Sequence, residues 1–269
     1  MRITALFIIL IFLVGACSCA SPDNMEIPGI VEEVETENTE ICMINEDGNT
    51  LETRINTPEG FVRTEAEDGS FAEFLREYEM KADKTPVMLY DGRGKGNQEA
   101  HAAVFNMDMI NGDLQQCADS IMRLYAEYYM ESGQEEKIAF HYTDGTLCKY
   151  TDYNDFEKYL RTVFSYAGTL SMETYETETI SVSEMQAGDI IINAGSPGHV
   201  VMIVDVCENA EGEKAYLLAQ GYMPAQDFHV LKNPLHNDDP WYHESEIQFP
   251  LETPEYVFDN INMVRRLTY

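Results

Sequence analysis

The stretch GDIIINAGSPGHVVMIV, residues 188–204, decides the fold of this chain. An apolar run at 190–192 is followed by a Gly-rich loop, and a second apolar run covers 199–206. Short apolar runs bounded by turn residues are typical of buried strands. The polar stretch 208–214 then turns the chain back into a third apolar run, 215–220. We therefore expect these three runs to pair as neighbouring antiparallel strands.

Helical patterns precede these strands. Apolar residues at helical spacing predict a helix from Asp113 to about Glu131, and Asp113 followed by Gln116 gives its start a capping-box order. Further expected elements are helices at 70–78 and 154–166, strands at 87–90 and 102–107, and a hairpin turn over 91–96. An antiparallel sheet beside two or three helices defines an α+β domain.

The N-terminal residues have the order of a secretory leader. A positive residue and an apolar run at 3–14 precede two small residues and Cys17. The run is shorter than the roughly 20 apolar residues of a membrane-spanning helix. Small residues directly before a cysteine resemble the bacterial lipobox, in which the thiol is acylated and becomes the new N-terminus. We expect a signal peptide over 1–16 and a lipid on Cys17, with cleavage without a lipid, or acylation of Cys19, as alternatives.

The residues that follow the leader predict a tether and then one domain. Residues 17–40 are acidic, lack aromatic side chains and contain two prolines, which is typical of a flexible segment. Residues 41–269 are long enough for a single α+β domain, and the 44% apolar content supports a buried core. We therefore expect an exported chain that is lipid-anchored to a membrane in the cell envelope.

The charge of the chain limits its partners. It has 17 basic and 48 acidic residues, a formal net charge of −31. Phosphate polymers and anionic lipid surfaces are repelled by such a chain at moderate salt. We expect no nucleic-acid partner, and membrane association only through the N-terminal lipid.

Four cysteines remain beyond the leader region: Cys42, Cys117, Cys148 and Cys207. Outside the cytosol they could form disulfides in any of three pairings. None has the Cys-x-x-Cys spacing of a zinc or redox site. We expect no metal site and no cofactor.

Cys117 and His199 are the candidate nucleophile and base. In a helix that begins after Asp113, Cys117 lies near unpaired N–H groups and the positive end of the helix dipole, which favour the thiolate. Cys117 also lies on the apolar stripe of that helix, so core packing is the alternative. His199 opens a strand at the rim of the sheet, where it can act as a base. His101, at the head of another expected strand, is a rival base.

A third group is expected on the strand that follows His199. A hairpin centred near residues 210–211 places His199 opposite a position at about 221, give or take two. Gln220 falls in this window, and its amide could orient the imidazole by accepting from one ring N–H. Further candidate oxyanion-binding or pocket residues are Gln115, Gln116, Tyr222, Asp227 and His229.

The order of these groups resembles that of the papain-like cysteine hydrolases. The strings MQAGDII at 185–191 and PGHVVMIV at 197–204 resemble those of their bacterial cell-wall branch, the NlpC-type peptidases. This resemblance implies a papain-like architecture, hydrolysis of an amide or ester, and cell-wall peptide as the first substrate to consider. The string QQCAD at 115–119 departs from the Asp-Cys-Ser-Gly string that those enzymes usually carry.

A second resemblance covers most of the chain beyond the leader. The strings DLQQCAD at 113–119 and LAQGYMPAQDFH at 218–229 resemble the bacterial family of domain of unknown function 4846, whose members are lipoprotein-like. That resemblance implies a location and no activity. We therefore expect an envelope lipoprotein that acts as a cysteine hydrolase. The alternative is a non-catalytic envelope lipoprotein that binds glycan, peptide or a partner protein through the same cleft.

Overall fold

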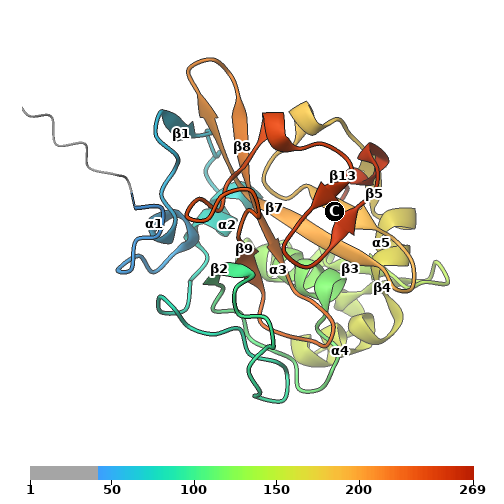
Figure 1. Ribbon diagram of the computed structural model, residues 1–269. Helices are drawn as coiled ribbons and strands as arrows, with labels where there is room; N and C mark the ends of the chain where they lie inside the picture. Colours follow the sequence, from blue (N-terminus) through green and yellow to red (C-terminus); the bar gives the residue numbers. More distant parts are fainter. Residues whose placement is uncertain (1–41) are drawn as a thin grey trace, which may run out of the picture. The chain divides into compact units, whose positions relative to one another are not determined.

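An antiparallel sheet forms the centre of the structure, a computed structural model that describes residues 42–269 (Figure 1). The strands of the main sheet are β1 (Phe61–Arg63), β2 (His101–Val104), β5 (Thr177–Thr179), β6 (Ile190–Asn193), β7 (His199–Asn209), β8 (Lys214–Gln220), β9 (His229–Leu231), β10 (Tyr242–His243) and β13 (Val264–Leu267). Their order is β2-β9-β8-β7-β6-β13-β5, with β1 paired to β7 and β10 to β8. All of these pairings are antiparallel. The predicted pairing of the three central runs is confirmed by β6, β7 and β8.

Five α-helices, two small hairpins and several short 3-10 helices make up the rest of the regular structure in the described residues. The helices are α1 (Leu51–Arg54), α2 (Phe71–Glu77), α3 (Cys117–Glu131), α4 (Phe156–Tyr166) and α5 (Thr169–Tyr175). The two-stranded sheets are β3 (Ala139–His141) with β4 (Leu147–Lys149), and β11 (Leu251–Glu252) with β12 (Val257–Phe258). The predicted α+β class, with a large antiparallel sheet and few helices, is therefore confirmed.

The domain boundaries predicted at the N-terminus lie outside the described residues. This applies to the signal peptide over 1–16, the lipid on Cys17, the tether over 17–40 and the first residue of the predicted domain. Residues 42–269 all belong to one compact unit. Within that range no helix is both long enough and apolar enough to cross a bilayer.

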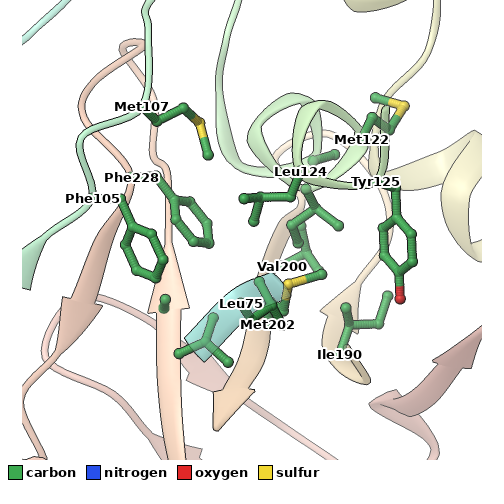
Figure 2. Close-up of a cluster of buried hydrophobic side chains, with 14 of the residues drawn as sticks. Leu75, Phe105, Met107, Met122, Leu124, Tyr125, Ile190, Val200, Met202 and Phe228 are labelled. Atoms are coloured by element: carbon green, nitrogen blue, oxygen red, sulfur yellow. The ribbon is translucent and has the colours of Figure 1, made fainter. Parts of the chain in front are cut away.

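The strand β7 separates two hydrophobic clusters because successive side chains of a strand point to opposite faces. Val200 and Met202 belong to the larger cluster, which also contains the apolar face of α3. Figure 2 shows them below α3, together with Ile190 of β6. Val201 belongs to the second cluster, which contains Phe258. The two faces of β7 therefore have different surroundings, and this alternation extends to His199 at its start, whose ring packs against Phe258 of the second cluster.

The helix α3 begins later than the sequence predicts. Its first residue is Cys117 and its N-cap is Gln116, whose backbone N–H donates to Asp119 Oδ2 at 3.0 Å. The predicted start at Asp113 is wrong, because the carboxylate of Asp113 instead accepts from the backbone N–H of Ala225 at 2.7 Å. That bond ties the segment before α3 to the loop after β8. Cys117 is consequently the first helical residue rather than the fourth.

Other predicted elements need smaller corrections. Residues 87–90 do not form a strand: Met88 and Leu89 make only isolated bridges, to Gly94 and Gln226. The expected turn is present, since the N–H of Gly92 donates to the carbonyl of Leu89 at 2.9 Å. The strand expected at 102–107 is β2, which ends at Val104. The helices expected at 70–78 and 154–166 are α2, which is shorter by one residue at each end, and α4, which begins two residues later.

A buried carboxylate joins β1 and α2 to the middle of β7. Asp205 follows a register shift in the pairing of β7 with β8, and it is fully buried. Its oxygens accept from Arg63 Nε at 2.6 Å and from Arg76 Nε at 2.8 Å. A buried charge needs such partners to offset its loss of hydration. Both β1 and α2 are thereby fixed to the sheet on which the candidate site lies.

Candidate functional site

The structure brings His199 and Gln220 into contact at one end of the sheet. His199 is the first residue of β7 and Gln220 the last of β8, and both are buried. His199 Nε2 lies 2.7 Å from Gln220 Oε1. The imidazole also packs against Tyr222 and Tyr256, with ring centroids 4.7 and 4.8 Å away. Its other nitrogen, Nδ1, has no hydrogen-bond partner within residues 42–269, yet it is not among the fully enclosed polar atoms.

Gln220 belongs to a larger group of buried and half-buried polar side chains. Its Nε2 donates to Glu255 Oε2 at 2.9 Å and lies 3.5 Å from His229 Nε2. Lys95 forms an ion pair with the same Glu255 oxygen, and its Nζ lies 3.5 Å from His229 Nε2. We call His199, Gln220, His229, Glu255 and Lys95 the polar network.

Two members of the polar network were missed from the sequence. Lys95 lies in the Gly-rich segment that predicts a turn, and nothing in that segment indicates a partner 160 residues away. Glu255 is one of 48 acidic residues in the chain. It follows the last predicted strand by more than thirty residues, so no hairpin geometry could place it. No sequence signal distinguishes either residue from its neighbours.

Both histidines of the network are held in the neutral form. Burial lowers the pKa of His199 from 6.5 to about 4, although its hydrogen bond to Gln220 acts in the opposite direction. Burial, followed by the nearby charge of Lys95, lowers the pKa of His229 to about 3. The rival base, His101, lies at the start of β2 with its ring centroid 6.1 Å from that of His229. Burial lowers the pKa of His101 as well.

Cys117 is a buried, neutral thiol. It is 8% exposed, and burial followed by the charge of Asp119 raises its pKa from 9.0 to about 11. The backbone N–H groups of Ala118 and Val200 act in the opposite direction without reversing this shift. The expected preference for the thiolate at a helix start is therefore wrong for this structure. Desolvation of the sulfur outweighs the helix terminus.

Cys117 and His199 both lie near the start of β7, in different surroundings. Cys117 belongs to the cluster under α3, next to the backbone of Val200, whereas the imidazole faces Tyr222, Tyr256 and Phe258. Within the described residues no hydrogen bond joins the thiol to the imidazole. The two groups thus lie around the same end of β7 without direct bonding.

A cavity of about 210 Å³ opens beside Cys117. Its lining comes from four places: the start of α3 with the residues before it, the junction between α4 and α5, the loop before β7, and Met223 in the loop after β8. Representative lining residues are Gln116, Cys117, Asp119, Thr169 and Gly198. The cavity therefore gives a small ligand access to the thiol and to the residue that precedes His199.

Asp119 is an uncharged acid in the lining of this cavity. It is 6% exposed, and its Oδ1 has no hydrogen-bond partner within residues 42–269. Burial raises its pKa from 3.8 to about 8, although the N–H of Gln116 acts in the opposite direction. At neutral pH the carboxyl group is protonated and can donate one hydrogen bond.

Of the five remaining predicted pocket residues, one lines the cavity and four do not. Gln116 lines the cavity, but Gln115 points away from it and donates to the carbonyl of Asp108 at 3.0 Å. Tyr222 covers the imidazole and donates to the carbonyl of Glu255 at 3.2 Å. Asp227 is held outside the cavity by an ion pair with Lys81 at 2.8 Å. His229 belongs to the polar network rather than to the mouth of a pocket.

The described cysteines are all free thiols. Cys42 is exposed, whereas Cys117, Cys148 and Cys207 are buried. From residue 42 to the C-terminus, no group of three or more His, Cys, Asp or Glu side chains is arranged to hold a metal ion.

Fold and site together define an antiparallel α+β protein with a histidine–glutamine pair beside a helix-start cysteine. The chain belongs to the family described as Domain of unknown function (4846), which matches residues 51–156 and 150–265. The match includes Cys117, the polar network and the cavity lining. Neither a curated protein nor a solved structure matches the chain.

Proposed function

We propose that this protein is a cell-envelope cysteine hydrolase of papain-like type, acting on an amide or ester outside the cytoplasm. The observation that supports this function is the 2.7 Å contact between His199 Nε2 and Gln220 Oε1, which leaves Nδ1 free at the start of β7. A glutamine that holds one imidazole nitrogen while the other takes a proton is the arrangement that nucleophilic catalysis requires. Cell-wall peptide is the first substrate to test.

The protonation states favour a general-base mechanism over a preformed ion pair. The Cys117 thiol and the His199 imidazole are both neutral at pH 7. The sulfur attacks the carbonyl carbon while its proton passes to Nδ1, and the bond to the leaving nitrogen or oxygen then breaks as that group takes the proton. Water hydrolyses the resulting thioester, which restores the thiol and releases the acid. No cofactor enters this sequence.

The mechanism needs the sulfur to meet the imidazole at the rim of the sheet. Cys117 is the first residue of α3, and His199 is the first residue of β7, so each lies at an end of its element rather than in the middle. A change of the Cys117 χ1 rotamer moves the sulfur without moving the helix. The protonated Asp119 and the Gln116 amide then lie in the lining where a carbonyl oxygen could be held.

The test uses an activated ester as probe. The full chain in detergent micelles is mixed with p-nitrophenyl acetate, and nitrophenol release and intact mass are followed. We expect an initial burst with one acetyl group on Cys117. His199→Ala should slow the Cys117-dependent burst by about a hundredfold or more, the usual contribution of a general base.

Matched variants decide the outcome. Cys148→Ala removes another buried cysteine and should keep the burst, whereas Cys117→Ala should abolish it. Equal nitrophenol release by Cys117→Ala and the unmodified chain would contradict the hydrolase. Purified cell-wall fragments are then the natural substrate assay, with new amino termini as the readout.

A second candidate function is favoured by the raised pKa of Cys117. A thiol held protonated by burial, and not hydrogen-bonded to His199 in the described structure, suits a non-catalytic envelope lipoprotein. Such a protein would bind glycan, peptide or a partner protein at the cavity beside α3. Absence of any Cys117-dependent acetylation, together with saturable binding of cell-wall fragments that Asp119→Ala weakens, would select this function.

A further inference from the structure

The side-chain amide of Gln220 has only one orientation that satisfies its neighbours. Oxygen and nitrogen of an amide are assigned from the hydrogen-bond network around them. On one side of Gln220 lies the carboxylate of Glu255, 2.9 Å from Nε2. An ionised carboxylate accepts hydrogen bonds and cannot donate them. The NH₂ group of Gln220 must therefore face Glu255, and the carbonyl oxygen must face His199.

His229 favours the same orientation more weakly, since its Nε2 lies 3.5 Å from Gln220 Nε2, against 2.9 Å for Glu255 Oε2. Its Nδ1 lies 2.9 Å from the carbonyl oxygen of Asp227, so Nδ1 carries the hydrogen. The pKa of His229, lowered to about 3 by burial, keeps the ring neutral. Its Nε2 is then an acceptor, and it lies 3.5 Å from Gln220 Nε2. Both neighbours of the amide nitrogen are acceptors.

Lys95 forms an ion pair with Glu255. Its ammonium group contacts both Glu255 Oε2 and His229 Nε2, and the lysine side chain is 6% exposed. The carboxylate of such an ion pair accepts hydrogen bonds. The ion pair thus fixes the Gln220 amide from a position that does not touch the cavity beside Cys117.

We propose that Glu255, supported by Lys95 and His229, is a positioning residue that locks His199 in the tautomer with hydrogen on Nε2. The carbonyl oxygen of Gln220 can only accept, so the nitrogen 2.7 Å away must donate. Nδ1 is then the unprotonated nitrogen, and it has no hydrogen-bond partner within residues 42–269. The use of Nδ1 as a base rests on the proposed hydrolase, whereas the tautomer itself does not.

The tautomer can be read directly by NMR. Chains labelled with ¹⁵N-histidine give two-bond ¹H–¹⁵N spectra in which protonated and unprotonated ring nitrogens have separate shifts, and His199→Gln identifies the signals of His199. At pH 7 we expect a single neutral Nε2–H tautomer for His199 and a single Nδ1–H tautomer for His229. A His199 ring with hydrogen on Nδ1, or a charged ring, would overturn the proposal without any variant.

A charge-pair variant tests Glu255 itself. Replacing Lys95→Met and Glu255→Leu together removes both charges, which buried sites tolerate better than the loss of one partner. The amide then loses its carboxylate acceptor, and we expect loss of the single Nε2–H pattern of His199 as the second tautomer becomes populated. An unchanged pattern in a variant with native circular dichroism would overturn the role of Glu255.

The control is another carboxylate bound to a histidine. Glu246 bonds His236 and takes no part in the polar network, so Glu246→Gln should leave the His199 pattern unchanged. The NMR and acetylation experiments together distinguish failure of this inference from failure of the proposed hydrolase. An inert Cys117 with a locked His199 would refute only the hydrolase, whereas Cys117-dependent acetylation with a mixed tautomer would refute only the positioning role.

Discussion

At the scale of single residues, burial decides the protonation of the candidate site. The rise of the Cys117 pKa from 9.0 to about 11 corresponds to about 3 kcal/mol. A helix N-terminus contributes at most about 2 kcal/mol to a charge beside it. The desolvation of the sulfur is therefore the larger effect. The same cause keeps Asp119, His199 and His229 uncharged at neutral pH.

Asp119 gives this effect a measurable consequence for stability. Its pKa in the folded chain is about 8, against an ordinary value of 3.8, so the folded chain holds a proton that the unfolded chain has lost. Stability must then fall as pH rises from about 4 to about 8. Asp119→Asn removes this loss and keeps an oxygen to accept the Gln116 N–H. We expect the variant to gain on the order of a few kcal/mol over the unmodified chain between pH 5 and pH 8.5, measured by urea unfolding.

An exposed carboxylate serves as the comparison for Asp119. Asp144 has its pKa lowered by the N–H of Thr146, the opposite direction, so Asp144→Asn should gain no stability as pH rises. If Asp119→Asn and the unmodified chain show the same dependence of unfolding free energy on pH, the carboxyl group is not protonated in the folded chain. Its proposed donor role in the cavity would then fail too.

At the scale of elements, the contact of α3 with the end of β8 positions the site. A Cβ at Gly221 would lie 2.6 Å from Ser120 Oγ and 2.8 Å from the backbone oxygen of Gln116. The helix start can approach this closely only because residue 221 has no side chain. The contact at Gly221 thus fixes the start of α3, and with it Cys117, relative to the end of β8.

Gly221→Ala should therefore displace the start of α3. The backbone contact cannot yield by a side-chain rotation, and overpacking of this kind costs typically 1–3 kcal/mol. We expect a loss of about 2 kcal/mol in the unfolding free energy, together with a shifted Tyr222 and His199 environment in NMR spectra. Gly96→Ala is the control, because nothing lies within 4 Å of its added Cβ. A Gly221→Ala chain as stable as this control would show that the helix start is not held by the contact.

The sequence predicts the elements that form from neighbouring residues. The hairpin from β7 to β8 is read from apolar runs and one polar turn, and its arithmetic gives a window of positions opposite His199 that contains Gln220, which the structure places 2.7 Å from the imidazole. The start of α3 could not be predicted, because Asp113 bonds Ala225, more than a hundred residues away. Lys95 and Glu255 were missed for the same reason. Long-range polar contacts leave no periodic signal in the chain.

At the scale of the whole molecule, the scarce basic residues stabilise the interior. Only 17 residues are Lys or Arg, yet Arg63, Arg76 and Lys95 form ion pairs with buried or half-buried carboxylates. Basic side chains used in this way are not available to neutralise the surface. We expect the net charge of −31 to oppose association with anionic membranes.

This charge makes the proposed lipid on Cys17 the decisive attachment to a membrane. Each buried methylene of an acyl chain contributes about 0.8 kcal/mol to membrane binding, whereas an acidic surface opposes it. We expect the full chain, expressed in a bacterial host, to partition into the detergent phase of Triton X-114 and to incorporate labelled palmitate. Cys17→Ser should abolish both, while Cys19→Ser, the matched control two residues away, should keep both. Release of the chain by Cys19→Ser alone would move the anchor to that residue, and retention of Cys17→Ser in the detergent phase would refute lipid anchoring at Cys17.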